Sequence, residues 1–173
     1  MRFDQLLWKC LAPGKYESSE SNITAALDPQ PGETVLLFEI DGPAFRAGQP
    51  GVKVCDLLFF YRGPAAPKPV LLFVELKGSD YETAEAQVVN AIRRVVAELS
   101  RDCAGADPAR ASQDLRLVRE SASVTIRAVV LLGVALPFNR KQRLKDLFQQ
   151  TGIVFRYHSE TRFKRTDVRV DLA

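Results

Sequence analysis

Two strongly apolar runs in the middle of the chain carry charged residues, and these charges limit what the chain can fold into. Residues 54–60 read VCDLLFF and contain Asp56. Residues 71–78 read LLFVELKG and contain Glu75 and Lys77. Burying an unpaired charge is costly, so such residues are normally exposed, paired, or bound to a ligand. Any fold of this chain must provide one of these three solutions for each charge.

Length and composition indicate an ordinary soluble globular protein. The 173 residues are 46% hydrophobic and 26% charged, which is typical of one domain with a substantial core, here residues 1–173. No apolar run reaches the roughly 18 residues that a membrane-spanning helix needs. The first five residues, MRFDQ, place an acid where a signal peptide requires apolar residues. We therefore expect a cytoplasmic protein without a membrane partner.

The cysteine and histidine content argues against several kinds of disulfide and metal site. The three cysteines, Cys10, Cys55 and Cys103, are widely spaced and form no CxxC pair, which argues against a disulfide framework or a zinc site. Cys55 is interpreted as a small core residue. The single histidine, His158, excludes a His–His metal pair.

Charge is distributed unevenly along the chain. The net charge is +3, but residues 137–173 hold nine lysines and arginines against four acids. The basic runs at 139–145 and 162–165 could contact phosphates. They could equally be a solvated helix face and a basic tail.

The order of the elements predicts a mixed sheet. Residues 1–30 read as a helical segment, with helices at about Phe3–Leu11 and Ser18–Leu27. The core, residues 31–135, begins with three strands whose short connections favour an antiparallel meander: Thr34–Ile40, Lys53–Tyr61 and Val70–Leu76.

A helix beginning at Ser79 should follow this meander, because residues 79–82 fit a capping box. The apolar run Val124–Leu136 then predicts a central strand. Residues 136–173 read as a basic helix (Arg140–Gln150), a last strand (Ile153–Tyr157) and a tail. The fold class is therefore α/β, with three α/β/α layers in which helices cover both faces of a central mixed sheet.

Strand geometry brings the three charges together. Side chains alternate along a strand, so Glu75 and Lys77 point the same way, and a hairpin would place Asp56 level with Glu75. Two converging carboxylates repel each other unless a cation lies between them, and Mg²⁺ is commonly bound by one or two carboxylates plus a substrate phosphate. Lys77 could then orient or deprotonate a water, or neutralise charge on the phosphate. Alternatively, Glu75 and Lys77 form an ion pair on a half-exposed strand, worth about 0–1 kcal/mol.

The pattern of Asp56, eighteen residues, and then Glu75-Leu76-Lys77 resembles the PD-(D/E)xK nuclease superfamily, which has the restriction-endonuclease-like fold. The predicted order αβββαβ is similar to the core of that fold over roughly residues 16–135, and the C-terminal helix and strand are additional. The resemblance implies that Asp56 and Glu75 hold Mg²⁺, for which Mn²⁺ is the usual substitute. It also implies that the backbone carbonyl of Leu76 assists and that Lys77 serves the attacking water. Cys55 stands where the family has a proline before the first acid.

Further residues are supporting candidates by the same resemblance. Gln87 matches a glutamine on the next helix, and Glu20 or Glu17 matches a glutamate on the first helix; Gln87 could also be solvated, and Glu20 could simply favour a helix N-terminus. Candidate nucleic-acid contacts are Lys53, Arg94, Arg140 and Lys141. Lys53 could also be an ordinary exposed lysine.

The resemblance implies a Mg²⁺-dependent nuclease that hydrolyses phosphodiester bonds in DNA and leaves a 5′-phosphate and a 3′-hydroxyl, in genome defence, repair or recombination. The sequence does not separate DNA from RNA as the substrate. One site cuts one strand, so we expect a homodimer or a subunit of a larger complex if a duplex is cut. The alternative is a catalytically inactive nuclease-like module that binds nucleic acid or scaffolds a protein complex.

Overall fold

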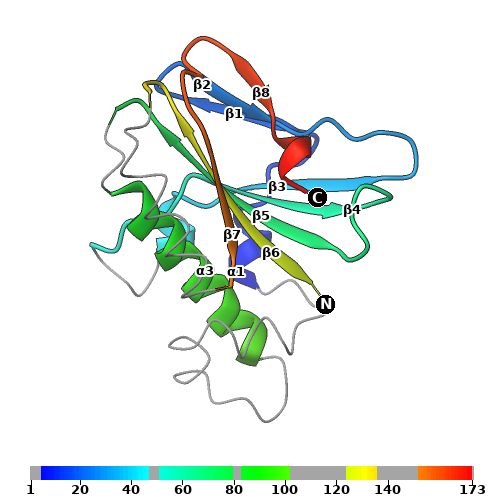
Figure 1. The fold of residues 1–173 in the computed structure, drawn as a ribbon. Helices are drawn as coiled ribbons and strands as arrows, with labels where there is room; N and C mark the ends of the chain where they lie inside the picture. Colours follow the sequence, from blue (N-terminus) through cyan, green and yellow to red (C-terminus); the bar gives the residue numbers. More distant parts are fainter. Residues whose placement is uncertain (1–4, 47–50, 80–82, 102–123, 136–151, 173) are drawn as a thin grey trace.

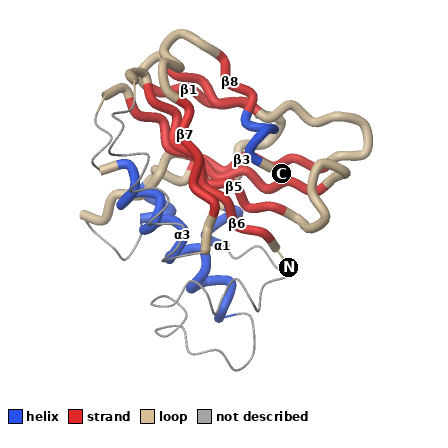
Figure 2. Tube along the Cα trace, viewed as in Figure 1, coloured by secondary structure: helices blue, strands red, loops and turns tan. Residues whose placement is uncertain are grey.

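A five-stranded mixed sheet forms the centre of the molecule (Figures 1 and 2). The computed structural model describes residues 5–46, 51–79, 83–101, 124–135 and 152–172. The strands lie side by side in chain order: β3 (Thr34–Glu39), β4 (Leu57–Arg62), β5 (Val70–Lys77), β6 (Thr125–Leu132) and β7 (Val154–His158).

The first three strands form the predicted antiparallel meander. Leu37 pairs with Phe59, and Phe59 pairs in turn with Leu72. β6 runs parallel to β5, and β7 runs parallel to β6. Parallel neighbours need a crossover connection, and helix α3 (Ala84–Arg101) lies within the first of these crossovers. The sheet is therefore mixed, as the sequence predicts.

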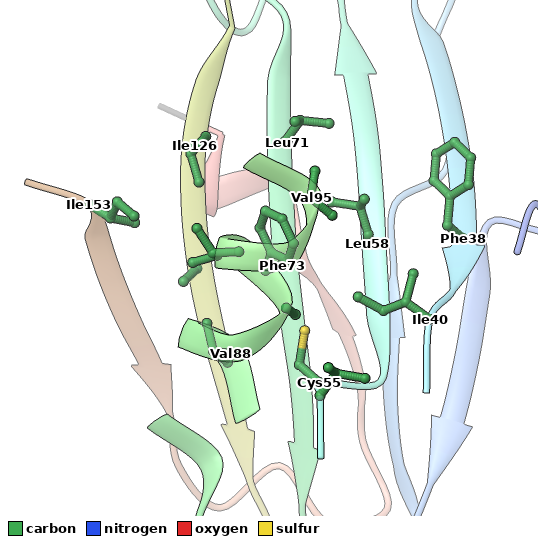
Figure 3. Close-up of a cluster of buried hydrophobic side chains, with 14 of the residues drawn as sticks. Phe38, Ile40, Cys55, Leu58, Leu71, Phe73, Val88, Val95, Ile126 and Ile153 are labelled. Atoms are coloured by element: carbon green, nitrogen blue, oxygen red, sulfur yellow. The ribbon is translucent and has the colours of Figure 1, made fainter. Parts of the chain in front are cut away.

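Helix α3 packs on one face of the sheet through an apolar stripe. Ala84, Val88, Ala91 and Val95 are all buried, as the helical spacing predicts. Figure 3 shows Val88 and Val95 lying over side chains of the central strands, with Cys55 in the same cluster. The short helices α1 (Gln5–Trp8) and α2 (Pro43–Arg46) contribute Leu7 and Phe45 to this core.

A second, smaller sheet covers the opposite face (Figure 1). It consists of β1 (Glu17–Glu20), β2 (Ile23–Ala26) and β8 (Arg165–Asp167), and the 3-10 helix η1 (Val168–Asp171) follows directly. β2 is antiparallel to β1 and parallel to β8. Ile23 and Leu27 pack here against Leu57 and Leu72. In the described part of the chain this face is thus covered by a sheet, where the sequence analysis expected helices.

The helix predicted at Ser18–Leu27 is wrong. The segment is a hairpin in which Glu20 pairs with Ile23 across a two-residue turn. Ser21 and Asn22 have φ values of 53° and 62°, the left-handed conformation that a type I′ hairpin turn requires at both positions. The segment 17–20, ESSE, has no apolar stripe for a helix to bury, so pairing with β2 decides its structure.

Other predicted boundaries shift modestly. β4 begins at Leu57 rather than Lys53, and β6 ends at Leu132 rather than Leu136. Helix α3 begins at Ala84, and Ser79 precedes it as a bend. The predicted helix Arg140–Gln150 lies outside the described residues. No helix in the described ranges is long and apolar enough to cross a membrane.

Candidate active site

Asp56, Glu75 and Lys77 lie at one end of the five-stranded sheet, where β3 and β5 end and β4 begins. Leu57 is the register partner of Val74, which places Asp56, one residue further out, level with Glu75. Glu75 and Lys77 share one face of β5 by alternation. Nζ of Lys77 lies 2.8 Å from Oε1 of Glu75.

Both carboxylates are buried. Glu75 is 0% exposed and Asp56 is 8% exposed. The backbone N–H of Leu76 donates a hydrogen bond to Oδ2 of Asp56 at 2.6 Å. Oε2 of Glu75 receives no hydrogen bond from any described residue. An exposed ion pair on a half-solvated strand therefore does not describe Glu75 and Lys77, since the acid is fully enclosed.

Burial and mutual repulsion favour the protonated forms of the two acids. Loss of hydration and the negative charge of Glu75 together raise the pKa of Asp56 to about 8, while the Leu76 hydrogen bond acts in the opposite direction. Burial also raises the pKa of Glu75 to about 7, opposed by the nearby Lys77 ammonium. Burial works against the charge on Lys77, yet its contact with Glu75 leaves the Lys77 pKa above its ordinary value. Lys77 is thus an ammonium at neutral pH.

An acidic cleft of about 380 Å³ opens beside Asp56. Glu20, Glu39 and Asp41 line it together with Asp56 and Leu76. The pKa of Asp41 is raised by burial, with a further contribution from Glu20 and an opposing one from Arg46. Asp41 was not among the residues predicted for the site, because Asp41-Gly42-Pro43 reads as a turn. The sequence feature that could have identified Asp41 is its position directly after an apolar strand of the meander that also carries Asp56 and Glu75.

Glu20 reaches the site from an unexpected element. The resemblance placed it on a first helix, but it is the last residue of β1. It nevertheless lines the cleft and contributes to the raised pKa of Asp56. The other candidate, Glu17, is an exposed ion-pair partner of Arg165 at 2.6 Å. The structure therefore favours Glu20 over Glu17 as the supporting acid.

The remaining candidates lie on the α3 side or outside the described residues. Gln87 is buried rather than solvated, and its Nε2 donates to the Val54 carbonyl at 3.2 Å. Arg94 lies over the ring of Phe45, 5.4 Å from its centroid. Lys53 is exposed and precedes β4 instead of lying on it. Arg140 and Lys141 lie outside the described residues.

A divalent cation fits the chemistry of the two buried acids. A cation would remove their repulsion and would give Oε2 of Glu75 the partner that it lacks among the described residues. Within those residues, no group of three or more His, Cys, Asp or Glu side chains is arranged as a complete metal site. Mg²⁺ does not require one, because it retains waters and binds substrate phosphate. The role of the Leu76 carbonyl stays a prediction.

Comparisons with known proteins give no match for this chain among family models, curated proteins or solved structures.

Proposed function

We propose that this protein is a Mg²⁺-dependent nuclease whose site is formed by Asp56, Glu75 and Lys77. The observation that carries the proposal is the enclosed Glu75 carboxylate, which lies level with Asp56 and 2.8 Å from the Lys77 ammonium. A protein gains nothing in stability from two acids buried side by side, so their placement suggests a ligand that they share. Asp56 and Glu75 would hold Mg²⁺, with Mn²⁺ as the substitute.

The bound metal would supply a water of lowered pKa and polarise the scissile phosphate. Because its pKa is raised, Lys77 carries a positive charge at neutral pH, and this limits the roles that it can have in catalysis. An ammonium is suited to neutralising charge on a phosphate oxygen or orienting a water, and it cannot accept a proton. We therefore assign Lys77 to charge stabilisation rather than to general-base catalysis. Glu20 and Asp41 would raise the negative potential that attracts the cation.

The proposed substrate is DNA, with a 5′-phosphate and a 3′-hydroxyl as products, as the resemblance implies. The carboxylates lining the cleft would repel a phosphodiester in the absence of metal, so the cation should bind before the scissile phosphate enters the cleft. The described part of the chain provides one such site, and each site cuts one strand. Cleavage of a duplex would then need a homodimer or a partner subunit, and nicking should precede linearisation.

The direct test is cleavage of supercoiled plasmid and single-stranded DNA with Mg²⁺ or Mn²⁺. Asp56→Asn and Lys77→Ala should each lower the rate at least about 100-fold, the scale expected when one transition-state contact is removed. Lys68→Ala is the matched control, because Lys68 is an exposed lysine at the opposite end of β5 and should cut like wild type. Equal cutting by all four proteins would reject the assignment.

A binding module is the second candidate, and one observation favours it. Burial raises the pKa values of Asp56 and Glu75 to about 8 and about 7, so both acids could remain protonated and hold no cation. Calorimetry distinguishes the two candidates. Absence of heat from Mn²⁺ at millimolar concentration, combined with retained DNA binding, would establish the non-catalytic module.

A further inference from the structure

Phe163 is a large apolar side chain held in open solvent. It is 81% exposed, more than Trp8 at 68% or Val170 at 59%. Its φ of 60° lies in the left-handed region, which is unfavourable for a bulky residue. A strained backbone persists only where surrounding contacts enforce it, and such strain gathers at functional sites. An exposed ring on a strained backbone contributes little to folding.

The loop that carries Phe163, residues 159–164 between β7 and β8, is firmly attached to the sheet (Figure 1). The backbone N–H and the hydroxyl of Thr161 both donate to the Leu132 carbonyl, at 2.9 and 2.8 Å. The N–H of Phe163 donates to the Asn22 carbonyl at 2.7 Å. The ring is thus presented by a fixed scaffold.

This loop borders the candidate active site. Leu132, which anchors Thr161, is the register partner of Lys77 on the adjacent strand. Asn22, which anchors Phe163, lies two residues after Glu20 of the acidic cleft. Arg162 lies beside Gly133, where its Nε would be 3.5 Å from an added Cβ. The backbone N–H of Gly133 in turn donates to the Lys77 carbonyl at 2.9 Å. The loop therefore lies at the same end of the sheet as Lys77.

The charges around the ring suit a nucleic acid. Arg162 and Lys164 flank Phe163 and are exposed. Neither forms an ion pair with an acid of the described residues, whereas the next cation, Arg165, pairs with Glu17 and Asp28. Glu160 is the one acid in the loop. An aromatic face between two unpaired cations is the pattern with which proteins hold single strands, where bases stack on the ring and phosphates pair with the cations.

We propose that residues 159–164 bind single-stranded nucleic acid, with Phe163 stacking on an unpaired base and Arg162 and Lys164 contacting the flanking phosphates. The inference rests on the proposed nuclease function, because it assigns the substrate of that site. It goes further in stating that the strand presented to Asp56 and Glu75 is unpaired next to the point of cleavage.

The test measures binding of a fluorescein-labelled 12-nucleotide single strand by anisotropy, in EDTA, so that no metal chemistry contributes. Phe163→Asn removes the ring and keeps a residue that tolerates the left-handed backbone. It should weaken binding by about 5- to 100-fold, the range measured for removal of one stacked base contact. Phe163→Trp should restore wild-type affinity. Trp8→Ala is the matched control, since Trp8 is an exposed aromatic on α1 across the sheet.

Three results would overturn the inference: unchanged single-strand binding by Phe163→Asn, an equal loss on a duplex of the same length, or no single-strand binding by wild type. Thermal melting of Phe163→Asn should match wild type, which excludes a folding effect. Because the assay contains no metal, its outcome is separate from the cleavage test of Asp56 and Lys77.

Discussion

Asp56 and Glu75 are the residues on which the proposed chemistry depends, and their environment determines how they respond to pH. Both acids are removed from water, and the backbone N–H of Leu76 donates a hydrogen bond to Asp56. Their pKa values of about 8 and about 7 exceed the ordinary values of 3.8 and 4.5. The folded protein therefore holds protons at neutral pH that the unfolded chain has released.

This difference in protonation predicts the direction of a stability change. Between about pH 4 and 8 the folded state binds more protons than the unfolded state, so the free energy of unfolding should fall as pH rises. Asp56→Asn should flatten this fall and raise the Tm at pH 8 by a few degrees, since 1 kcal/mol corresponds to about 2–4 °C in a domain of this size. Thermal melting in EDTA from pH 5 to 8.5 measures the pH dependence of the Tm and the Tm difference between Asp56→Asn and wild type.

Metal competes with the same protons, so Mn²⁺ should raise the Tm of wild type more at pH 8 than at pH 6. Asp56→Asn should lose most of this increase. Asp28→Asn is the control, because Asp28 is an exposed acid paired with Arg165, and it should behave like wild type. A wild-type Tm that is independent of both pH and Mn²⁺ would show that the two acids are not coupled as described.

The glycines that follow β5 and β6 hold the two strand ends close together. A Cβ on Gly133 would lie 2.7 Å from the backbone carbonyl oxygen of Gly78, a distance that forces the backbone to move. A Cβ on Gly78 would meet the Cβ of Ser21 at 3.6 Å, an ordinary contact. The first position is therefore intolerant of a side chain, and the second is not.

Gly133→Ala should accordingly lower the free energy of unfolding by about 1–3 kcal/mol, the usual cost of overpacking. Gly78→Ala, one strand away, should melt within about 1 °C of wild type. Denaturant unfolding of the two variants side by side makes the comparison. A Gly133→Ala protein as stable as Gly78→Ala would mean that the strand ends are further apart than the structure places them.

Sequence patterns predicted the elements that bury long apolar runs, and they failed where a strand is polar or very short. Apolar periodicity alone predicts β4, which contains Phe59, and β5, which contains Phe73. It also predicts the buried stripe of α3. β1 is polar on every side and β8 is only three residues long, so neither has a pattern of its own. β1 forms by its local pairing with β2, and β8 forms by the pairing of Arg165 with Thr24, across most of the chain.

The residues of the candidate site also fall into two groups, those that the sequence could place and those that it could not. Asp56, Glu75 and Lys77 could be placed from strand alternation and a hairpin, because all three belong to one local meander. Asp41 belongs to the same meander but reads as part of a turn. The contribution of Glu20 from a strand could not be predicted, since it depends on how the small sheet covers the large one. The placement of the 159–164 loop beside Lys77 depends on that arrangement too.

The molecule as a whole joins distant segments at one end of its main sheet. The meander supplies two buried acids and an ammonium, the β1–β2 hairpin supplies Glu20, and the loop after β7 supplies Arg162 and Phe163. The acids could attract a cation, and the basic loop beside them could hold a strand of the opposite charge. The proposed function therefore depends above all on a divalent cation bound between Asp56 and Glu75.

A crystal structure of the protein soaked in Mn²⁺, with anomalous data collected near the manganese edge, tests this claim most directly. We predict one strong anomalous peak in contact with carboxylate oxygens of both Asp56 and Glu75, at roughly the 2.0–2.1 Å expected of a small divalent ion. The peak should vanish in Asp56→Asn. A fully soaked crystal with no peak between these two side chains would contradict the account.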